Sequence, residues 1–365
     1  MKNALFIIIL FLFLPIIAFA QDEAIKNDSF FKAKVIDIIE QRINILPDGS
    51  EAIQQNLLLK GLEGEYKNKE INFNGIGNFD VIGKSIYKIG DKVMVVESFG
   101  AEGGSEYYIT DYVRTQSLGW LIAVFVVSLF IVGRWKGLRS ILALALTFFV
   151  IIKYIIPQIL SGANPVFVTV AGSFVILLII IYITEGFRPL AHISAISIFF
   201  SLMITIFISW VFVFGSKLTG VSSEEVSFLI NIGDQAINFR GLLLAGIIIG
   251  ALGVLDDVVI SQTAAVEQIA KANHSLGRYE VFKRSYEIGI SHIASMANTL
   301  FLAYAGASLP LLVLFISGQS AFTGWGQIIN NEAIATEIIR TLSGSIGLIL
   351  SVPITTFVAV LWYKK

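Results

Sequence analysis

Long runs of apolar residues constrain the fold of this chain more than any other feature. Several of them approach or exceed eighteen residues, and a helix needs about twenty apolar residues to cross a bilayer core of roughly 30 Å. Of the 365 residues, 55% are hydrophobic and only 15% are charged, which is more apolar sequence than a soluble core needs. The sequence therefore predicts a polytopic α-helical membrane protein embedded in a lipid bilayer.

Hydropathy divides the second part of the chain into seven predicted transmembrane helices. They cover residues 117–133, 138–157, 165–184, 190–214, 240–261, 288–316 and 334–362. Between the fifth and sixth helices, residues 262–287 mix apolar and charged side chains in a pattern typical of an amphipathic helix. We expect that segment to lie along the cytoplasmic membrane surface.

Two segments precede the predicted spans. Residues 1–20 combine an early lysine, an apolar run and Ala18-Phe19-Ala20, which matches a secretory signal peptide; an uncleaved anchor helix is the alternative. Residues 21–115 alternate strand-like runs with turn signals, which predicts a small β-rich domain, either an OB-like barrel or a sandwich. The predicted strands are 33–39, 56–60, 70–73, 92–97 and 106–112. The transmembrane domain then occupies residues 116–365.

Positive charges in the loops predict the orientation, because Lys and Arg are enriched on the cytoplasmic side of membrane proteins. With the β domain outside, only Lys217 and Arg240 fall in outer loops. The positive residues on the inner side are Arg134, Lys136, Arg139, Arg188, Lys271, Arg278, Lys283, Arg284, Lys364 and Lys365. The β domain is therefore expected to be extracytoplasmic and the C-terminus cytoplasmic.

Composition excludes several classes of function. The net charge is −1, so no electrostatic argument for nucleic-acid binding applies. The chain has no cysteine, which removes disulfides and thiolate metal sites. Its three histidines form no HExxH-type pair, so neither a metal site nor a cofactor is expected.

Two consecutive aspartates, Asp256 and Asp257, interrupt the fifth predicted span. Counted from Leu242 at ~1.5 Å per residue, they lie about 20 Å into the bilayer, where a carboxylate is costly and marks a functional candidate. Asp257 shares a helix face with glycines and Asp256 is turned about 100° away, so we expect Asp257 to be the more buried. The glycines predicted to pack closely against other helices are Gly246, Gly250, Gly253, Gly306, Gly344 and Gly347.

The sixth span places His292 at a depth similar to that of Asp257, because the fifth and sixth helices run in opposite directions. A carboxylate beside an imidazole either relays a proton or forms a static pair that fixes helix packing. In the seventh span, Glu337 and Arg340 are three residues apart and are expected to form a structural ion pair. Further candidates for a proton or ion path are Ser261, Gln262, Asn298 and Thr299.

Two blocks of sequence carry a resemblance to a known family. GLLLAGIIIGALGVLDDVVIS (241–261) and SHIASMANTLFLAYAGASLPLL (291–312) resemble the YibE/F-like family of bacterial multi-pass membrane proteins. The resemblance covers residues 118–362 and implies a bacterial inner-membrane location, but no activity. A single Asp is typical of the family at position 257, so Asp256 is a departure. Residues 241–269 also resemble, more weakly, the paired-Asp transmembrane helix of RND-type exporters, whose aspartates take up and release protons.

Two functions stay open at this point. One is a proton- or ion-coupled transporter or energy transducer of unknown substrate, with Asp257 as the titrating group, Asp256 as its neighbour and His292 as a relay. The other is a non-catalytic membrane assembly or envelope-sensing protein in which the Asp, His and Gly positions are structural. A homo-oligomer, or an unidentified envelope partner bound through the β domain, fits either function.

An enzyme is not expected. An intramembrane aspartyl protease needs a GxGD motif and a second, separated aspartate. Here Gly253-Val254-Leu255-Asp256 lacks the second glycine, and no other predicted span contains an Asp.

Overall fold

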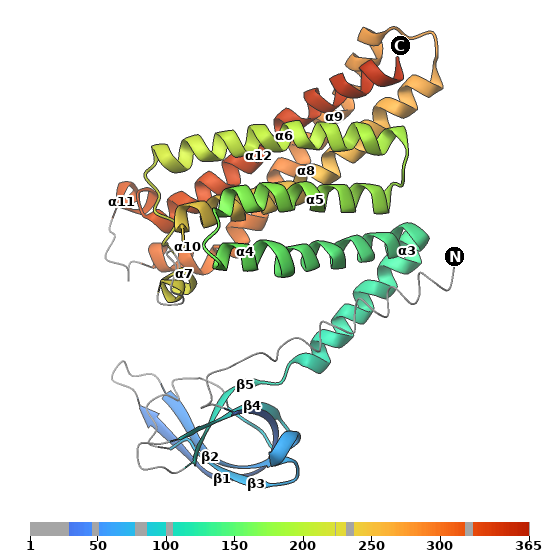
Figure 1. The fold of residues 1–365 in the computed structure, drawn as a ribbon. Coiled ribbons are helices and arrows are strands. Elements are labelled where there is room, and N and C mark those ends of the chain that lie inside the picture. The colour runs from blue at the N-terminus through green and yellow to red at the C-terminus, as the bar shows by residue number, and fades with distance from the viewer. Residues whose placement is uncertain are drawn as a thin grey trace. The chain divides into compact units, whose positions relative to one another are not determined.

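The structure, a computed structural model, describes residues 29–45, 51–76, 86–99, 105–222, 224–230, 237–317 and 324–364. The predicted signal peptide at 1–20 lies outside the described residues. The chain divides into two compact units, Met1–Ile131 and Val132–Lys365. Figure 1 shows the β-sheet of the first unit and the helices of the second, and each unit is described by itself below.

The first unit contains a five-stranded antiparallel sheet in the order β3-β2-β1-β4-β5. Its strands are β1 (Ser29–Ile45), β2 (Glu51–Gly61), β3 (Glu70–Asn74), β4 (Lys92–Phe99) and β5 (Ser105–Tyr112). Each contains one of the five predicted strand segments, so those predictions are confirmed.

Alternation along the strands turns one set of side chains toward a common core. Phe31, Ala33 and Val35 of β1 are at most 2% exposed and pack with Leu57 and Leu59 of β2. The edge strands β3 and β5 approach each other, so the sheet curls around this core.

Glu97 on β4 is held by hydroxyl groups. Tyr66 donates a hydrogen bond to its carboxylate, and Ser29 donates another over 3.1 Å. The Tyr66 hydrogen bond is the main cause that lowers the pKa of Glu97 from its ordinary value of 4.5. A carboxylate with a lowered pKa contributes stability above its unfolded-state pKa, and this stability is lost as the pH falls through the folded-state pKa.

We therefore expect acidification below pH 4.5 to loosen β4 and β5. The change Glu97→Gln should weaken these strands at neutral pH and reduce their dependence on pH, because the amide carries no charge for the hydroxyls to stabilise. Hydrogen–deuterium exchange of the full chain at neutral and acidic pH measures both effects. Equal protection of β4 in the two proteins at neutral pH would contradict the prediction.

Six helices in the described chain are long and apolar enough to cross a membrane. The first, Thr115–Leu160, joins α3 (Thr115–Val150), the π-helical turn η2 (Ile151–Ile155) and α4 (Ile156–Leu160). The others are α5 (Pro165–Thr184), α6 (Pro189–Gly215), α8 (Phe239–Ala272), α9 (Arg278–Ala307) and α12 (Glu332–Tyr363). The short helices are α7 (Glu224–Leu229), α10 (Leu309–Ile316) and α11 (Trp325–Ile329).

The expected count of seven spans is not confirmed. The first two predicted spans, 117–133 and 138–157, fall within the first candidate, which has 46 residues. A straight helix with that number of residues would be about 69 Å long at ~1.5 Å per residue, roughly twice what a bilayer core requires. This candidate is interrupted at Arg134, whose φ of 48° and ψ of −130° are not helical. The predicted sixth span, 288–316, is likewise divided between α9 and α10.

The prediction of a separate interfacial helix at residues 262–287 is wrong. α8 continues to Ala272 and α9 begins at Arg278, so the segment consists of the adjoining ends of two long helices. These helices have 34 and 30 residues, and a core of roughly 30 Å cannot cover either completely. Charged pairs such as Lys271–Glu267, 2.7 Å apart, occupy these ends and produce the same mixed pattern as a surface helix.

Local chemistry explains where several helices begin. Asn164, Asn238 and Asn331 precede α5, α8 and α12, and each side chain accepts a hydrogen bond from a backbone N–H in the first turn. Pro165 and Pro189 begin α5 and α6, where the missing proline N–H removes no helical hydrogen bond.

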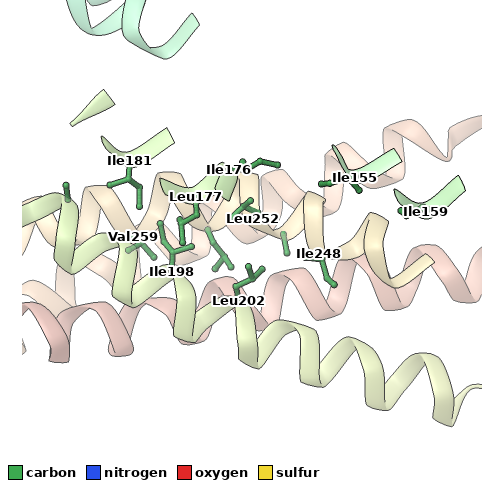
Figure 2. Packing of buried hydrophobic residues seen from close by; sticks show 13 residues of the cluster. Ile155, Ile159, Ile176, Leu177, Ile181, Ile198, Leu202, Ile248, Leu252 and Val259 are labelled. Atoms are coloured by element: carbon green, nitrogen blue, oxygen red, sulfur yellow. The ribbon is translucent and has the colours of Figure 1, made fainter. Parts of the chain in front are cut away.

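The largest buried apolar cluster lies where α5, α6 and α8 meet (Figure 2). Leu252 and Val259 of α8 pack there against Ile198 and Leu202 of α6 and against Leu177 of α5. Many other bulky apolar side chains instead lie on the outside of the helices. Such a surface is expected of helices that face lipid.

Candidate functional site

The aspartate pair lies within α8, between two different helix faces. The bulky face carries Leu252, Leu255 and Val259, which are at most 2% exposed in the cluster with α5 and α6. The glycine face is open at Gly246 and Gly253, where an added Cβ would meet no other atom within 4 Å, whereas at Gly250 it would meet the hydroxyl of Tyr304. The covered side of α8 is thus the bulky side.

The expected order of burial is reversed. Asp256 is half-buried, and its Oδ1 atom has no hydrogen-bond partner among the described residues, whereas Asp257 is exposed. The physical reason is the position of each residue on the helix. Asp256 is adjacent to the packed Leu252 and Leu255, while Asp257 follows the open glycine face.

Acidic groups dominate the electrostatic surroundings of Asp256. Its charged neighbours are Asp257 and Glu185, which follows α5. The Glu185 side chain is 13% exposed and pairs with Lys136 at 3.3 Å and with Arg188 at 2.6 Å. Lys136 and Arg188 are therefore paired with Glu185 rather than with Asp256. The two adjacent aspartates repel each other when both are charged.

The proposed relay from Asp257 to His292 is not formed within the described part of the chain. Both side chains are exposed, and no hydrogen bond or ion pair between described residues joins them. Of the other polar candidates, those that are exposed as well are Ser261, Asn298 and Thr299.

Gln262 is the exception, because it is 1% exposed. Its Nε2 donates to the carbonyl of Ser285 on α9 over 2.8 Å and to Oγ1 of Thr356 on α12 over 2.7 Å. Its Oε1 has no partner among the described residues. A Cβ at Gly289 would lie 2.9 Å from that oxygen. Gln262 therefore ties α8, α9 and α12 together through one buried amide.

The six glycines predicted to pack closely fall into three groups. A Cβ at Gly347 would meet Oγ1 of Thr205 at 1.9 Å, and one at Gly250 would meet the hydroxyl of Tyr304 at 2.8 Å. At Gly344 the nearest atom, 3.5 Å away, is an ordinary contact. Gly306 is as open as Gly246 and Gly253.

On α12, Glu337 and Arg340 form an ion pair of 2.8 Å with both side chains partly exposed.

Sequence reasoning missed the polar face of α6. This face carries five hydroxyl residues, each at most 1% exposed: Ser194, Ser197, Ser201, Thr205 and Ser209. Their spacing of three, four, four and four residues marks one helix face and was visible in the sequence. The high hydropathy of the segment concealed it.

The described chain has several long apolar helices with polar groups buried between them. These features define a polytopic membrane protein. Residues 121–365 match the model of the family described as YibE/F-like protein, and the chain belongs to this family. Comparison with curated proteins and with solved structures finds no match. No group of three or more His, Asp or Glu side chains that could hold a metal ion occurs among the described residues.

Proposed function

We propose that this chain is a proton- or ion-coupled transporter or energy transducer that uses the Asp256–Asp257 pair. One observation carries the proposal: Asp256 is half-buried within a membrane-spanning candidate helix and has a carboxylate oxygen without a partner among the described residues. An ionisable group in such a helix is expensive and marks an ion or proton pathway by default. Two adjacent carboxylates also repel each other when both are charged, which couples their titrations.

The test is proton flux into proteoliposomes that contain the purified protein. The double variant Asp256→Asn/Asp257→Asn is expected to show no more flux than protein-free liposomes, because an amide cannot change its protonation state. Glu267→Gln on the same helix is the matched control, since Glu267 pairs with Lys271 near the end of α8 and should be dispensable. Wild-type flux in the double variant would overturn the proposal.

The open face of α8 favours a second function, a non-catalytic membrane assembly or envelope-sensing protein. An uncovered carboxylate such as Asp257 is costly in lipid, and glycine-rich faces are where helices approach each other closely. Under this alternative, another membrane protein or a second copy covers Gly246, Gly253 and Asp257. The double amide variant would then keep its partner, and proton flux would be absent from the wild type.

For location we propose the bacterial inner membrane, with a signal peptide at 1–20, the β domain at 21–115 outside the cytoplasm and the transmembrane domain at 116–365. The loop charges support the orientation. For the β domain we propose an OB-like barrel, because five strands curl with β3 and β5 at the two edges. A sandwich would need a second sheet facing the first.

Orientation can be tested with single cysteines, because the chain has none of its own. We expect Lys60→Cys, an exposed position on β2, to react with a membrane-impermeant maleimide while the cytoplasmic membrane is intact. Gly277→Cys, between α8 and α9, should react only after permeabilisation. If both react only after permeabilisation, Thr115–Leu160 crosses the membrane once and the β domain is cytoplasmic.

A further inference from the structure

The buried hydroxyls of α6 form a continuous face through the helical unit. From Ser194 to Ser209 this face extends about 22 Å at ~1.5 Å per residue, which is most of the thickness of a bilayer core. Ile198 and Leu202, which belong to the apolar cluster, lie on the same buried side of α6 and flank the hydroxyls along one edge. The buried side of α6 therefore carries a row of hydroxyls beside an apolar strip, and the opposite side carries exposed residues such as Phe207.

Helix α12 lies against the hydroxyl face and runs in the opposite direction. At one end, Glu332 at the start of α12 accepts hydrogen bonds from the backbone N–H groups of Thr219 and Gly220, which follow α6. At the other end, Ile193 near the start of α6 packs with Ala359 near the end of α12. The two helices are therefore antiparallel.

The close approach of Thr205 to Gly347 fixes the register between α6 and α12. Each step of four residues along α6 is matched by a step of four in the reverse direction along α12. This places buried hydroxyls of α12 opposite those of α6: Ser343 opposite Ser209, Ser351 opposite Ser201 and Thr355 opposite Ser197. We call these residues, together with Ser194 and Thr205 of α6, the hydroxyl seam.

Hydrogen bonding along the seam is incomplete. Ser201, Thr205 and Ser209 each donate to the backbone carbonyl four residues earlier. Ser197 and Thr355, which the register places at the same level, are 0% exposed, and their hydroxyls have no partner among the described residues. Buried polar atoms elsewhere in the helical unit share this condition: Thr169, Ser173, Ser285, Thr336, Ser345 and Oε1 of Gln262.

Packing alone does not account for this pattern. Small hydroxyl residues do occur at close helix contacts in membranes, where a hydroxyl bonded to its own helix is satisfied. An unpaired polar atom away from water is unfavourable, and buried polar groups in proteins are almost always paired with protein or with ordered water. Two facing orphan hydroxyls supply the polar partners that a buried water needs.

We infer that the hydroxyl seam binds water between α6 and α12 at the level of Ser197 and Thr355, and that this water is part of the proton path. The hydration follows from Ser197 and Thr355; its use for protons rests on the proposed function. Thr263, adjacent to Gln262 on α8, is joined to the seam, because Ser194 donates to its Oγ1 over 3.1 Å. The end of the seam that holds this water is therefore connected to the helix that carries Asp256.

Cysteine reactivity tests the hydration, and the cysteine-free chain supplies the background. Water-soluble 2-aminoethyl methanethiosulfonate reacts with thiolates, which form only where water reaches the sulfur. Ser197→Cys and Ile198→Cys are a matched pair, because both positions are 0% exposed and adjacent on α6, one in the seam and one in the apolar cluster. Phe207→Cys, at a position 64% exposed on the outer surface of α6, controls for a thiol that faces lipid.

We expect Ser197→Cys and Thr355→Cys in proteoliposomes to react at least about ten-fold faster than Ile198→Cys, because only the seam thiols can ionise. The mass of the adduct measures the rate. If both seam cysteines react as slowly as Ile198→Cys, the seam is dry and the inference is overturned. Labelling does not require transport, so an absence of proton flux in the wild type removes the proposed function separately. If labelled Ser197→Cys retains full proton flux, the seam is hydrated but is not the path.

Discussion

Gly347→Leu is expected to prevent accumulation of the folded protein, whereas Gly246→Leu should accumulate close to the wild-type level. A Cβ at Gly347 would lie 1.9 Å from Oγ1 and 3.0 Å from Cβ of Thr205. Thr205 cannot move away easily, because it is 1% exposed and its hydroxyl bonds the Ser201 carbonyl over 2.9 Å. Overpacking a core costs about 1–3 kcal/mol, and more when two helix backbones must separate.

Thermal unfolding in detergent, followed by size-exclusion chromatography, measures this effect. Gly246→Leu is the matched control, since a Cβ there meets nothing within 4 Å. Gly347→Ala should melt between the wild type and Gly347→Leu. Adding Thr205→Ala should restore part of the loss, because the two residues share one contact and their effects are not additive. A Gly347→Leu protein that melts like the wild type would show that α6 and α12 do not cross at this residue.

The secondary structure of the described residues could largely be predicted from the sequence. The spacing of apolar residues and the composition of a short segment favour either a helix or a strand without reference to the rest of the chain. Alternation of apolar and polar residues, bounded by turn residues, correctly predicted the position of each of the five described β-strands. The length of the apolar runs predicted where the long helices lie. The adjoining ends of α8 and α9, however, were wrongly predicted to form a separate surface helix. A charged end of a long helix and a surface helix share one amphipathic pattern, and only the continuity of the backbone separates them.

The candidate site was less predictable, because periodicity defines helix faces without showing which face is covered. The glycine face of α8 was expected to pack, as small residues do between membrane helices. The structure instead covers Leu252 and Leu255, which brings Asp256 rather than Asp257 against the packed side. The hydroxyl face of α6 was readable from its spacing, but its partner on α12 depends on the register at Gly347, which is a tertiary contact.

Asp256→Asn is expected to abolish proton flux, and Asp257→Asn to reduce it less. Asp256 is the more enclosed carboxylate, and one of its oxygens has no partner among the described residues, so a bound proton or ion would satisfy it. Asparagine has nearly the same shape but cannot titrate, so Asp256→Asn should insert and melt like the wild type. Flux in proteoliposomes, normalised to the amount of folded protein, measures the difference.

Glutamate supplies the control, because it keeps the titrating group while lengthening the side chain. Asp256→Glu should retain partial flux if protonation matters, and no more than Asp256→Asn if only the geometry of the side chain matters. The opposite order of the two amide variants would also be informative. The family resemblance singles out position 257, whereas enclosure singles out position 256. If Asp257→Asn alone stops the flux, the open face of α8 must be covered by another molecule in the active state, because a carboxylate exposed to lipid is too costly to serve as the titrating group.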